Sequence, residues 1–275
     1  MKQKVRLTDK KLIKEFWAII SVFTAITSLL ALVYEIPSKY KHKLAIIMFV
    51  IFIVIYLILW IRANLMSKIT LHINNSILEI RFGDIFTEPQ WKVICFNEYF
   101  DTRVDNNIIS ENSLNGRYIQ EFISDIDDLD KRIALDKHLK QKIVGTNKER
   151  AQGKNIKYKL GTIFKNEKYL LTAFSRFDED NRAIIDMQDY INFLLNFWNE
   201  VDIVYNSESV SIPLIGSGIT RFKDYNINEQ ELLELIIWSF KISRVKFTYP
   251  SRVSIILHES ARDKVNLYRL KGGGV

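Results

Sequence analysis

The most pronounced pattern in the sequence is a pair of apolar runs without a charged residue near the N-terminus. The first run covers residues 16–34 and the second covers residues 44–61. Read as helices that rise about 1.5 Å per residue, the two runs would be roughly 27–29 Å long, close to the ~30 Å hydrocarbon core of a bilayer. Aromatic residues such as Trp17 and Trp60 lie at the ends of the runs, as they do at membrane interfaces. The pattern therefore predicts a two-helix transmembrane hairpin over residues 16–64.

A signal peptide followed by a buried core helix is the alternative interpretation of the two runs. The first run is longer than the apolar core of a usual signal peptide and lacks a convincing small-x-small cleavage site, so the hairpin is favoured. Basic residues precede the first run at Lys2, Lys4, Arg6, Lys10, Lys11 and Lys14, and lie between the runs at Lys39, Lys41 and Lys43. Their excess on residues 1–15 predicts a basic cytoplasmic tail. Since two spans return the chain to the side on which it started, both termini are expected in the cytoplasm.

After residue 64 the pattern changes to short strands that alternate with amphipathic helices. Residues 69–73 and 77–82 alternate apolar and polar positions around Asn74-Asn75-Ser76, which predicts a β-hairpin. The strands predicted further along are 91–96, 158–164, 168–174, 210–215 and 252–257, the helices are 117–142, 186–205 and 229–242, and residues 144–155 are predicted as a surface loop. This order predicts an α/β domain over residues 65–275, with three layers (α/β/α) and a mixed sheet.

The net charge and the cysteine content limit which classes of function the sequence allows. The chain has 275 residues and a formal net charge of +7. Most of this excess comes from the N-terminal tail and the segment between the two runs, so the domain that follows is nearly neutral. A nearly neutral domain argues against binding to a phosphate backbone, and no nucleic-acid partner is expected. The single cysteine, Cys95, cannot form an intramolecular disulfide and is interpreted as a buried free thiol.

A glycine turn follows the apolar strand at residues 210–215. Gly216-Ser217-Gly218 interrupts this strand abruptly, and a helix is expected to follow. Open α/β sheets bind ligands where strands end, glycines let the backbone approach closely, and successive N–H groups in a tight turn bind anions. A diphosphate would suit such a turn, but an ordinary strand-to-helix turn is an equally good interpretation of the segment alone.

Two further segments, taken with this turn, resemble the macro domain, a fold that recognises ADP-ribose. The first is the turn Gly83-Asp84-Ile85-Phe86, and the second is the apolar strand that ends in Asn97. The turn itself reads Pro213-x-x-Gly-x-Gly-Ile219. The resemblance extends over residues 69–260. It implies that Asp84 accepts a hydrogen bond from the adenine amino group and that residues 216–220 wrap the diphosphate and the distal ribose.

More narrowly, two membrane spans joined to a divergent macro domain resemble the ThsA effectors of bacterial Thoeris anti-phage defence. The segments that carry this resemblance are GDIF, NEYFDT, SLNGRYI, LLTAFSRFDEDNRA and IPLIGSGITRF. The resemblance implies a multi-pass sensor in the inner (plasma) membrane, without a cofactor. A partner TIR-domain protein would consume NAD and make an ADP-ribose-derived messenger, of the histidine-ADP-ribose or cyclic ADP-ribose type, which the macro domain binds. Binding would favour a homo-oligomer, and the clustered hairpins would disrupt the lipid bilayer.

The sequence departs from the general macro-domain pattern at two positions. Macro domains that hydrolyse ADP-ribose often carry Asn-x-x-Asn after this strand, and here Phe100 replaces the second asparagine of the run that begins at Asn97. Arg221 stands where many macro domains keep the loop open and small. An aromatic ring cannot orient a water, although it can stack on a sugar or a base, so both changes favour a binding protein that is not an enzyme. The alternatives are a membrane-tethered ADP-ribosyl hydrolase and an adaptor that has lost ligand binding.

The residues predicted to bind the ligand follow the expected strand ends. They are Asp84, Ile85, Asn97, Phe100, Asp101, Thr102, Ser110, Ser113, Gly116, Arg176, Asn181, Pro213, Gly216, Ser217, Gly218, Ile219, Thr220 and Arg221. For the acidic cluster that Arg176 and Asn181 accompany, a pocket wall and a solvated turn are equally good interpretations. No catalytic residue is predicted, since Ser217 has no base beside it in the sequence. No metal site is predicted either, because the histidines are scattered and the acidic run at residues 125–130 lacks the spacing of a calcium loop.

Overall fold

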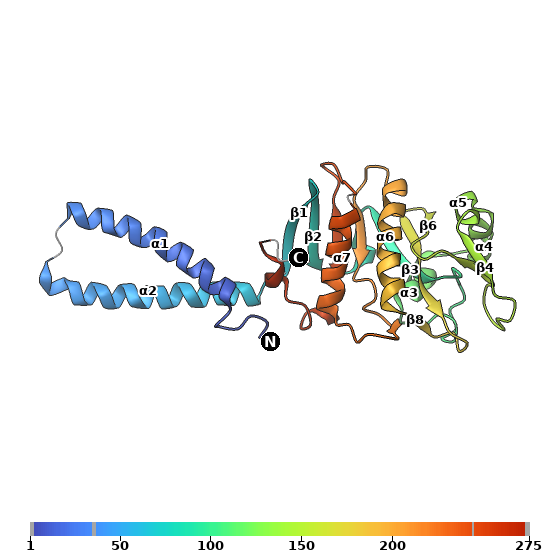
Figure 1. Cartoon of the computed structure of the whole chain (residues 1–275), viewed down its shortest axis with the longest axis horizontal. Helices are drawn as coiled ribbons and strands as arrows, with labels where there is room; N and C mark the ends of the chain where they lie inside the picture. The colour runs from blue at the N-terminus through green and yellow to red at the C-terminus, as the bar shows by residue number, and fades with distance from the viewer. Residues whose placement is uncertain (1–2, 35–36, 244, 273–275) are drawn as a thin grey trace. The chain divides into compact units, whose positions relative to one another are not determined.

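The structure is a computed structural model that describes residues 3–34, 37–243 and 245–272, so Lys2 of the predicted tail lies outside the described residues. The chain divides into two compact units, which are treated separately (Figure 1). The hairpin unit comprises Met1–Ser67 together with Asn266–Gly272, and the sheet unit comprises Lys68–Val265. Residues 266–272 therefore group with the N-terminal helices and not with the strands that precede them in the sequence.

Two long helices, α1 (Lys10–Val33) and α2 (Ser38–Asn64), form most of the hairpin unit. Within the described part of the chain, these two helices are long and apolar enough to cross a membrane, and most of their apolar side chains are exposed. Each helix begins before the apolar run that predicts it. In α1 the reason is Asp9, whose carboxylate accepts hydrogen bonds from the Lys11 and Leu12 N–H groups and so caps the helix N-terminus.

The base of the hairpin unit is closed by segments from both ends of the sequence. Its buried apolar cluster contains Val5, Leu12, Ala63 and Tyr268. The buried Asn64 side chain accepts a hydrogen bond from the Val5 N–H at 3.0 Å and donates one to the Trp60 carbonyl at 2.9 Å. The Lys11 ammonium donates to the Tyr268 carbonyl, in the 3₁₀ turn η3 (Leu267–Leu270), at 3.2 Å. The unit thus needs residues 266–272 to complete its packing.

Strands of the sheet unit form a mixed sheet and a separate two-stranded hairpin. The sheet strands are β1 (Lys68–Ile73), β2 (Ser76–Phe82), β3 (Trp91–Asn97), β6 (Ile163–Asn166), β7 (Tyr169–Phe177), β8 (Ala183–Ile185), β9 (Val210–Pro213), β10 (Arg221–Phe222) and β11 (Val253–Leu257); the hairpin strands are β4 (Ile143–Thr146) and β5 (Ile156–Tyr158). In the described part of the unit the sheet order is β1-β2-β11-β9-β3-β7-β8-β10, with β6 paired to β7. Strands β2, β11, β9, β3 and β7 are parallel, so their carboxyl ends lie along one edge of the sheet.

Helices cover both faces of this sheet (Figure 1). On one face lie α3 (Leu114–Phe122), α4 (Ile126–Leu135) and α5 (Lys137–Lys140), and on the other lie α6 (Met187–Val204) and α7 (Glu229–Ser243). Side chains of β7 alternate between the two faces. Leu171 and Ala173 belong to the core cluster that contains Tyr118 of α3, whereas the Phe174 ring packs on Phe193 of α6 with the ring centroids 4.8 Å apart. The predicted three-layer α/β/α architecture is confirmed.

Three predicted elements are wrong in their extent. The single helix predicted over residues 117–142 divides into α3, α4 and α5, because Asp125 and Asp136 each cap the N-terminus of a new helix. The strand predicted over residues 158–164 divides between β5 and β6, with Gly161 at a φ of +92° between them. The helix expected directly after the glycine turn is replaced by β10, which pairs with β8 before α7 begins.

Candidate functional site

A cavity of about 420 Å³ lies at the edge of the sheet where the parallel strands end. Residues in or just after the carboxyl ends of β2, β3, β7, β9 and β11 line it, and a further wall comes from the segment at residues 108–117 that leads into α3. Open α/β sheets bind ligands at this edge, because the loops after neighbouring strands enclose a crevice there. The position of the cavity makes it the candidate site of the sheet unit.

Asp84 lies at one end of the cavity, directly after β2. One of its carboxylate oxygens accepts a hydrogen bond from the Phe86 N–H at 3.0 Å and caps the 3₁₀ turn η1 (Ile85–Thr87). The other oxygen pairs with the Arg117 guanidinium of α3 at 3.4 Å, and this guanidinium lies 4.8 Å from the centroid of the Phe86 ring. The carboxylate is therefore held in place but remains half-exposed, as an acceptor for a donor group of a ligand needs to be.

Residues 213–220, called the late loop below, form the wall after β9. Gly216 has a φ of +93°, and a Cβ atom there would lie 3.1 Å from Leu232 and 3.3 Å from Phe222, so a glycine is required. A Cβ atom at Gly218 would meet nothing within 4 Å. The Tyr190 hydroxyl donates a hydrogen bond to the Ile215 carbonyl at 2.9 Å. The base of the late loop is thus fixed, whereas its tip is open to the cavity.

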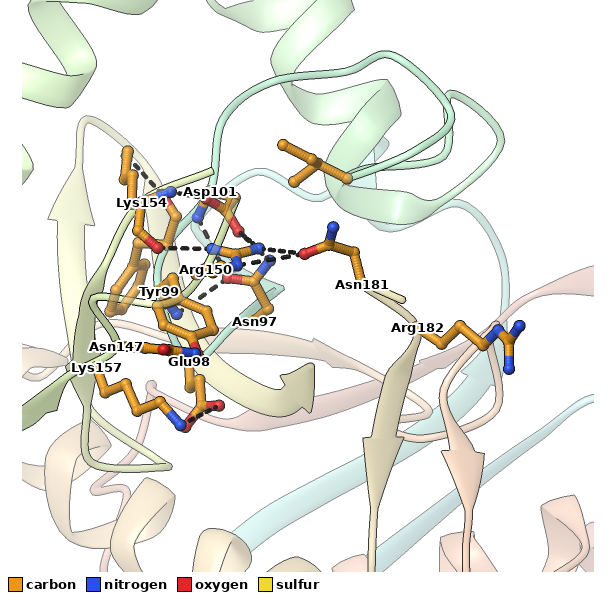
Figure 2. A network of polar contacts seen from close by, with 12 residues as sticks. Asn97, Glu98, Tyr99, Asp101, Asn147, Arg150, Lys154, Lys157, Asn181 and Arg182 are labelled. Atoms are coloured by element: carbon orange, nitrogen blue, oxygen red, sulfur yellow. Dashed lines mark hydrogen bonds and ion pairs between the residues drawn. The ribbon is translucent and has the colours of Figure 1, made fainter. Parts of the chain in front are cut away.

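Asn97 contributes to a second wall, and residues 97–102, called the β3-end segment below, hold it from behind. The Asn97 side-chain oxygen accepts hydrogen bonds from the Tyr99 N–H at 3.0 Å and the Asp101 N–H at 3.3 Å. The Asn97 amide nitrogen donates to the Asp101 carboxylate at 2.9 Å (Figure 2). These bonds fix the backbone where β3 leaves the sheet, so the Asn97 side chain has one orientation toward the cavity.

The wall at residues 108–117 depends on a second glycine. Ser113 caps α3 by accepting a hydrogen bond from the Gly116 N–H at 3.1 Å. A Cβ atom at Gly116 would lie 2.2 Å from the Ser110 carbonyl oxygen, which is closer than any van der Waals contact allows. The turn from residue 110 into α3 can therefore close over the cavity only with glycine at position 116.

The cavity offers several recognition groups, and the one thiol among them is not activated. The Cys95 thiol lines the cavity, and desolvation raises its pKa to about 12, so this thiol stays protonated at neutral pH. Among the residues that the structure describes, no three His, Cys, Asp or Glu side chains are grouped as metal ligands. A carboxylate at one end, a backbone-rich glycine turn and apolar walls suit an elongated ligand with both polar and apolar parts.

Comparison with known proteins identifies the family. The model of the family described as Thoeris protein ThsA, Macro domain, matches residues 78–258. Thoeris protein ThsA of Bacillus amyloliquefaciens (strain Y2) is 42% identical to this chain over 262 residues, which are 93% of this chain and 88% of that protein. The chain belongs to the ThsA family of Thoeris proteins.

Solved structures that resemble this ThsA-family chain are more distant. A mutant of the Oceanobacillus iheyensis macrodomain is 14% identical, covers 75% of this chain and 93% of its own, and superposes with a TM-score of 0.44. The Oceanobacillus iheyensis macrodomain with ADP is 15% identical, covers 74% of this chain and 95% of its own, and has a TM-score of 0.42.

The structure brings many of the predicted ligand-binding residues together around the cavity of this ThsA-family domain. They are Asp84, Ile85, Asn97, Ser110, Ser113, Pro213, Gly216, Ser217, Gly218, Ile219 and Thr220. These residues come from four segments of the sequence, at residues 84–85, 97, 110–113 and 213–220, and the parallel strands β2, β3 and β9 carry three of these segments to one edge.

Other predicted residues lie outside the cavity lining. The Phe100 ring is fully buried in the core cluster beside α3 and α4, so it does not face a ligand in this structure. The Thr102 hydroxyl donates to Asp130 at 2.7 Å. The side-chain oxygens of Asp101 and Asn181 accept hydrogen bonds from the Arg150 guanidinium. Gly116 packs behind the wall that it allows to close.

Two predicted arginines also lie outside this cavity. The Arg176 guanidinium forms ion pairs with Asp189 at 2.5 Å and with Glu98 at 3.4 Å. Arg221 lines a second hollow of about 630 Å³, which shares residues of the late loop with the cavity. Neither side chain contributes to the lining of the cavity between the late loop and the β3-end segment.

Sequence reasoning missed several residues that do line the cavity. Among the polar ones are Arg117 beside Asp84, Ser175 in β7, and His258 and Ser260 after β11. His258 follows directly on the predicted strand at residues 252–257, so the rule that ligands bind at carboxyl ends would have identified it. Arg117 gives no comparable signal, because its contact with Asp84 joins residues 33 positions apart in the sequence.

Proposed function

We propose that this chain is a membrane-anchored effector of anti-phage defence, whose sheet unit binds an ADP-ribose-derived messenger made by a partner TIR-domain protein. The observation that carries the proposal is the cavity of about 420 Å³ at the carboxyl ends of the parallel strands, in a chain of the ThsA macro-domain family. The messenger would be of the histidine-ADP-ribose or cyclic ADP-ribose type.

The ligand would lie along the sheet edge from β2 toward β3 and β7. At the β2 end, Asp84 would accept a hydrogen bond from the adenine amino group. The late loop would surround the diphosphate with its backbone N–H groups, since the open position at Gly218 leaves room for phosphate oxygens. Strands β2 and β3 are three positions apart in the sheet, a separation of roughly 14 Å at about 4.8 Å per strand, so the β3-end segment would face the distal ribose and its substituent.

Three features of the site support binding over turnover. Phe100, which stands in place of a second asparagine, is buried in the core and cannot orient a water in the cavity. The Asn97 side chain is engaged with Asp101 and with backbone N–H groups. The Cys95 thiol is protonated at neutral pH because of its raised pKa. A receptor that retains its ligand intact fits this arrangement better than a hydrolase does.

The hairpin unit would anchor the chain in the inner membrane, with both termini in the cytoplasm. The exposed apolar side chains of α1 and α2 would then be covered by lipid. Messenger binding would drive self-association of the sheet units, and clustered hairpins would disrupt the bilayer. A ligand shifts such an equilibrium only by its difference in affinity for the two states, so the assembled form has to bind the messenger more tightly.

Calorimetric titration of the full chain in detergent tests the proposal. The titrants are ADP-ribose, histidine-ADP-ribose and cyclic ADP-ribose, and chromatography of the ligand afterwards distinguishes binding from conversion. We expect saturable binding of at least one compound, recovery of that compound intact and a shift to larger species in size-exclusion chromatography. Recovery of a cleaved product would establish a hydrolase instead, and absence of binding to all three would overturn the proposal.

A pair of glycine variants provides the matched control for this titration. Gly218→Val adds a side chain in open space at the tip of the late loop, so it should leave the fold intact and block the ligand. Gly145→Val, in β4, also adds a side chain where nothing lies within 4 Å, but outside the cavity lining. Equal affinity of the two variants would place the ligand elsewhere.

A further inference from the structure

Arg150 connects two walls of the cavity from behind. It lies in the connection between β4 and β5, at residues 147–155, which the sequence predicts as a surface loop. Its side chain is nevertheless only 6% exposed. In Figure 2 its guanidinium lies between Asp101 and Asn181, to which it donates hydrogen bonds of 2.7 Å and 2.9 Å. Since a buried guanidinium without partners would be strongly destabilising, these contacts decide where the loop lies.

The connection is built to hold this arginine. The Arg150 guanidinium also donates to the Lys154 carbonyl at 2.6 Å and lies 4.0 Å from the centroid of the Tyr99 ring. Gly153 has a φ of +91°, and a Cβ atom there would lie 2.7 Å from the Arg150 Nη1 atom and 2.8 Å from an Asp101 carboxylate oxygen. Only glycine lets the backbone close over the pair so tightly. Arg150, Asp101 and Asn181 are together called the Arg150 bridge below.

On one side the Arg150 bridge reaches the β3-end segment. The Asp101 oxygen that accepts from Arg150 also accepts from the Asn97 amide nitrogen, at 2.9 Å. Asn97 lines the cavity. A continuous series of hydrogen bonds therefore runs from Arg150 through Asp101 to a side chain at the site, and it fixes the orientation of the Asn97 amide.

On the other side the Arg150 bridge reaches the turn between β7 and β8. Asn181 belongs to this turn and has a φ of +57°. Phe177 and Ala183, on either side of the turn, both line the cavity, and the Phe177 ring centroid lies 5.4 Å from the Arg150 guanidinium. Since β7 and β8 lie beyond β3 in the sheet order, this is the end of the cavity farthest from Asp84.

We propose that Arg150 is a positioning residue that sets specificity for the group bound at the end of the cavity remote from Asp84. The inference rests on the proposed function, because it requires that an ADP-ribose-type ligand occupies the cavity. By joining Asp101 to Asn181, Arg150 holds the Asn97 and Phe177 walls at one separation. A ligand that reaches these walls, such as ADP-ribose, depends on the bridge. ADP, which lacks the second ribose, does not reach them and depends only on Asp84 and the late loop.

The test compares the affinities of ADP and ADP-ribose for the full chain in detergent, by calorimetry. Arg150→Met keeps much of the side-chain volume and removes the bridge, whereas Arg150→Lys keeps the charge beside Asp101 but cannot reach both walls. Arg150→Met is expected to weaken ADP-ribose binding by about ten-fold and to leave ADP binding unchanged. Arg150→Lys should restore part of the loss, because it keeps the pair with Asp101. A purely structural role would lower both affinities together.

A second variant removes one side of the bridge at little risk to the fold. Asn181→Gly deletes the acceptor and keeps a residue that tolerates positive φ. Asn206→Gly, at a φ of +51° in the turn after α6 and outside the cavity lining, is its control. Asn181→Gly should lower the affinity for ADP-ribose relative to ADP, and Asn206→Gly should not.

Two outcomes separate this inference from the proposed function. If the wild-type chain binds neither ADP nor ADP-ribose, the proposed function fails and the inference fails with it. If the wild-type chain binds both, but the Arg150 and Asn181 variants change the two affinities equally or not at all, the inference alone is overturned.

Discussion

The late loop and the β3-end segment, which reaches the same cavity through Asn97, are built in opposite ways. The late loop is held at its base by Tyr190 and by the bond of Ser217 to a nearby carbonyl, and a side chain added at Gly218 would meet nothing within 4 Å. In the β3-end segment, both oxygens of the Asp101 carboxylate accept hydrogen bonds, and Arg150 supports it from behind. One wall is thus free to adapt to a ligand, and the other is shaped before a ligand arrives. Preorganised walls give specificity at small entropic loss, whereas adaptable ones close around a ligand once it is bound.

The largest effect that distinguishes the two walls is expected from Asp101→Ala. This substitution leaves the Arg150 guanidinium buried without its counter-charge and should lower the free energy of unfolding by about 3–5 kcal/mol. Ser217→Ala in the late loop should change it by less than about 0.5 kcal/mol, since the hydroxyl bonds only to a nearby carbonyl. Thermal and denaturant unfolding of the two variants, followed by tryptophan fluorescence, measures the contrast. Similar stabilities for the two would mean that the β3-end segment is no more rigid than the late loop.

A smaller loss of stability is expected within the late loop itself. Gly216→Val places a branched side chain at a φ of +93° and against Leu232 and Phe222, so it should destabilise the sheet unit by about 1–3 kcal/mol. Gly218→Val should keep wild-type stability and lose ligand affinity. If Gly218→Val unfolded at the same temperature as Gly216→Val, the tip of the loop would be as constrained as its base.

A loss of affinity with only a small loss of stability is expected at Asp84. Asp84→Ala removes the acceptor at the β2 end and should weaken binding of both ADP and ADP-ribose by about ten-fold or more. The exposed pair with Arg117 contributes little to folding, and loss of the cap on the Phe86 N–H should lower the free energy of unfolding by about 1 kcal/mol. Equal loss for both probes would contrast with the selective loss at Arg150. A selective loss at Asp84 would place the adenine elsewhere.

The smallest expected effect is a pH dependence of the free energy of unfolding, which arises at Lys154 beside the β3-end segment. Desolvation lowers the pKa of Lys154 below its ordinary value of 10.5, and its ion pair with Asp130 offsets this only in part. Between the lowered pKa and 10.5 the unfolded chain binds the proton that the folded chain has lost, so stability rises with pH in this window. Lys154→Met should lack that rise. Unfolding curves of both proteins from about pH 8 to 10.5 give the difference, and parallel curves would contradict it.

Local patterns were sufficient to predict most of the fold. Alternating residues gave the hairpin of β1 and β2, and a continuous apolar run gave the central strand β3. The same patterns pointed to the late loop, because it follows directly on a predicted strand, whereas Asp84 was predicted only from the resemblance to the macro domain. Helix boundaries within residues 117–142 were missed, since Asp125 and Asp136 read equally well as helix surface and as caps.

The Arg150 bridge shows why the rest of the site could not be predicted from the sequence. Asp101 and Asn181 follow strand ends, as ligand-binding residues do, and were predicted as such. Their side-chain oxygens accept hydrogen bonds from Arg150, which is 49 residues from Asp101 and 31 residues from Asn181 in the sequence. In the sequence, Arg150 stands among polar residues typical of a solvated loop, and only the long-range fold gives it two buried acceptors.

Residues 266–272 affect how the chain can be truncated in experiments and how its parts can be exchanged in evolution. Because they complete the base of the hairpin unit, the sheet unit is an insertion between two segments of one other unit. Truncation before residue 266 would uncover Leu12 and Val5, so it would damage the hairpin unit and leave the sheet unit untouched. Insertions of this kind can be exchanged as whole segments. A lineage can exchange residues 68–265 for another domain and retain the same hairpin unit.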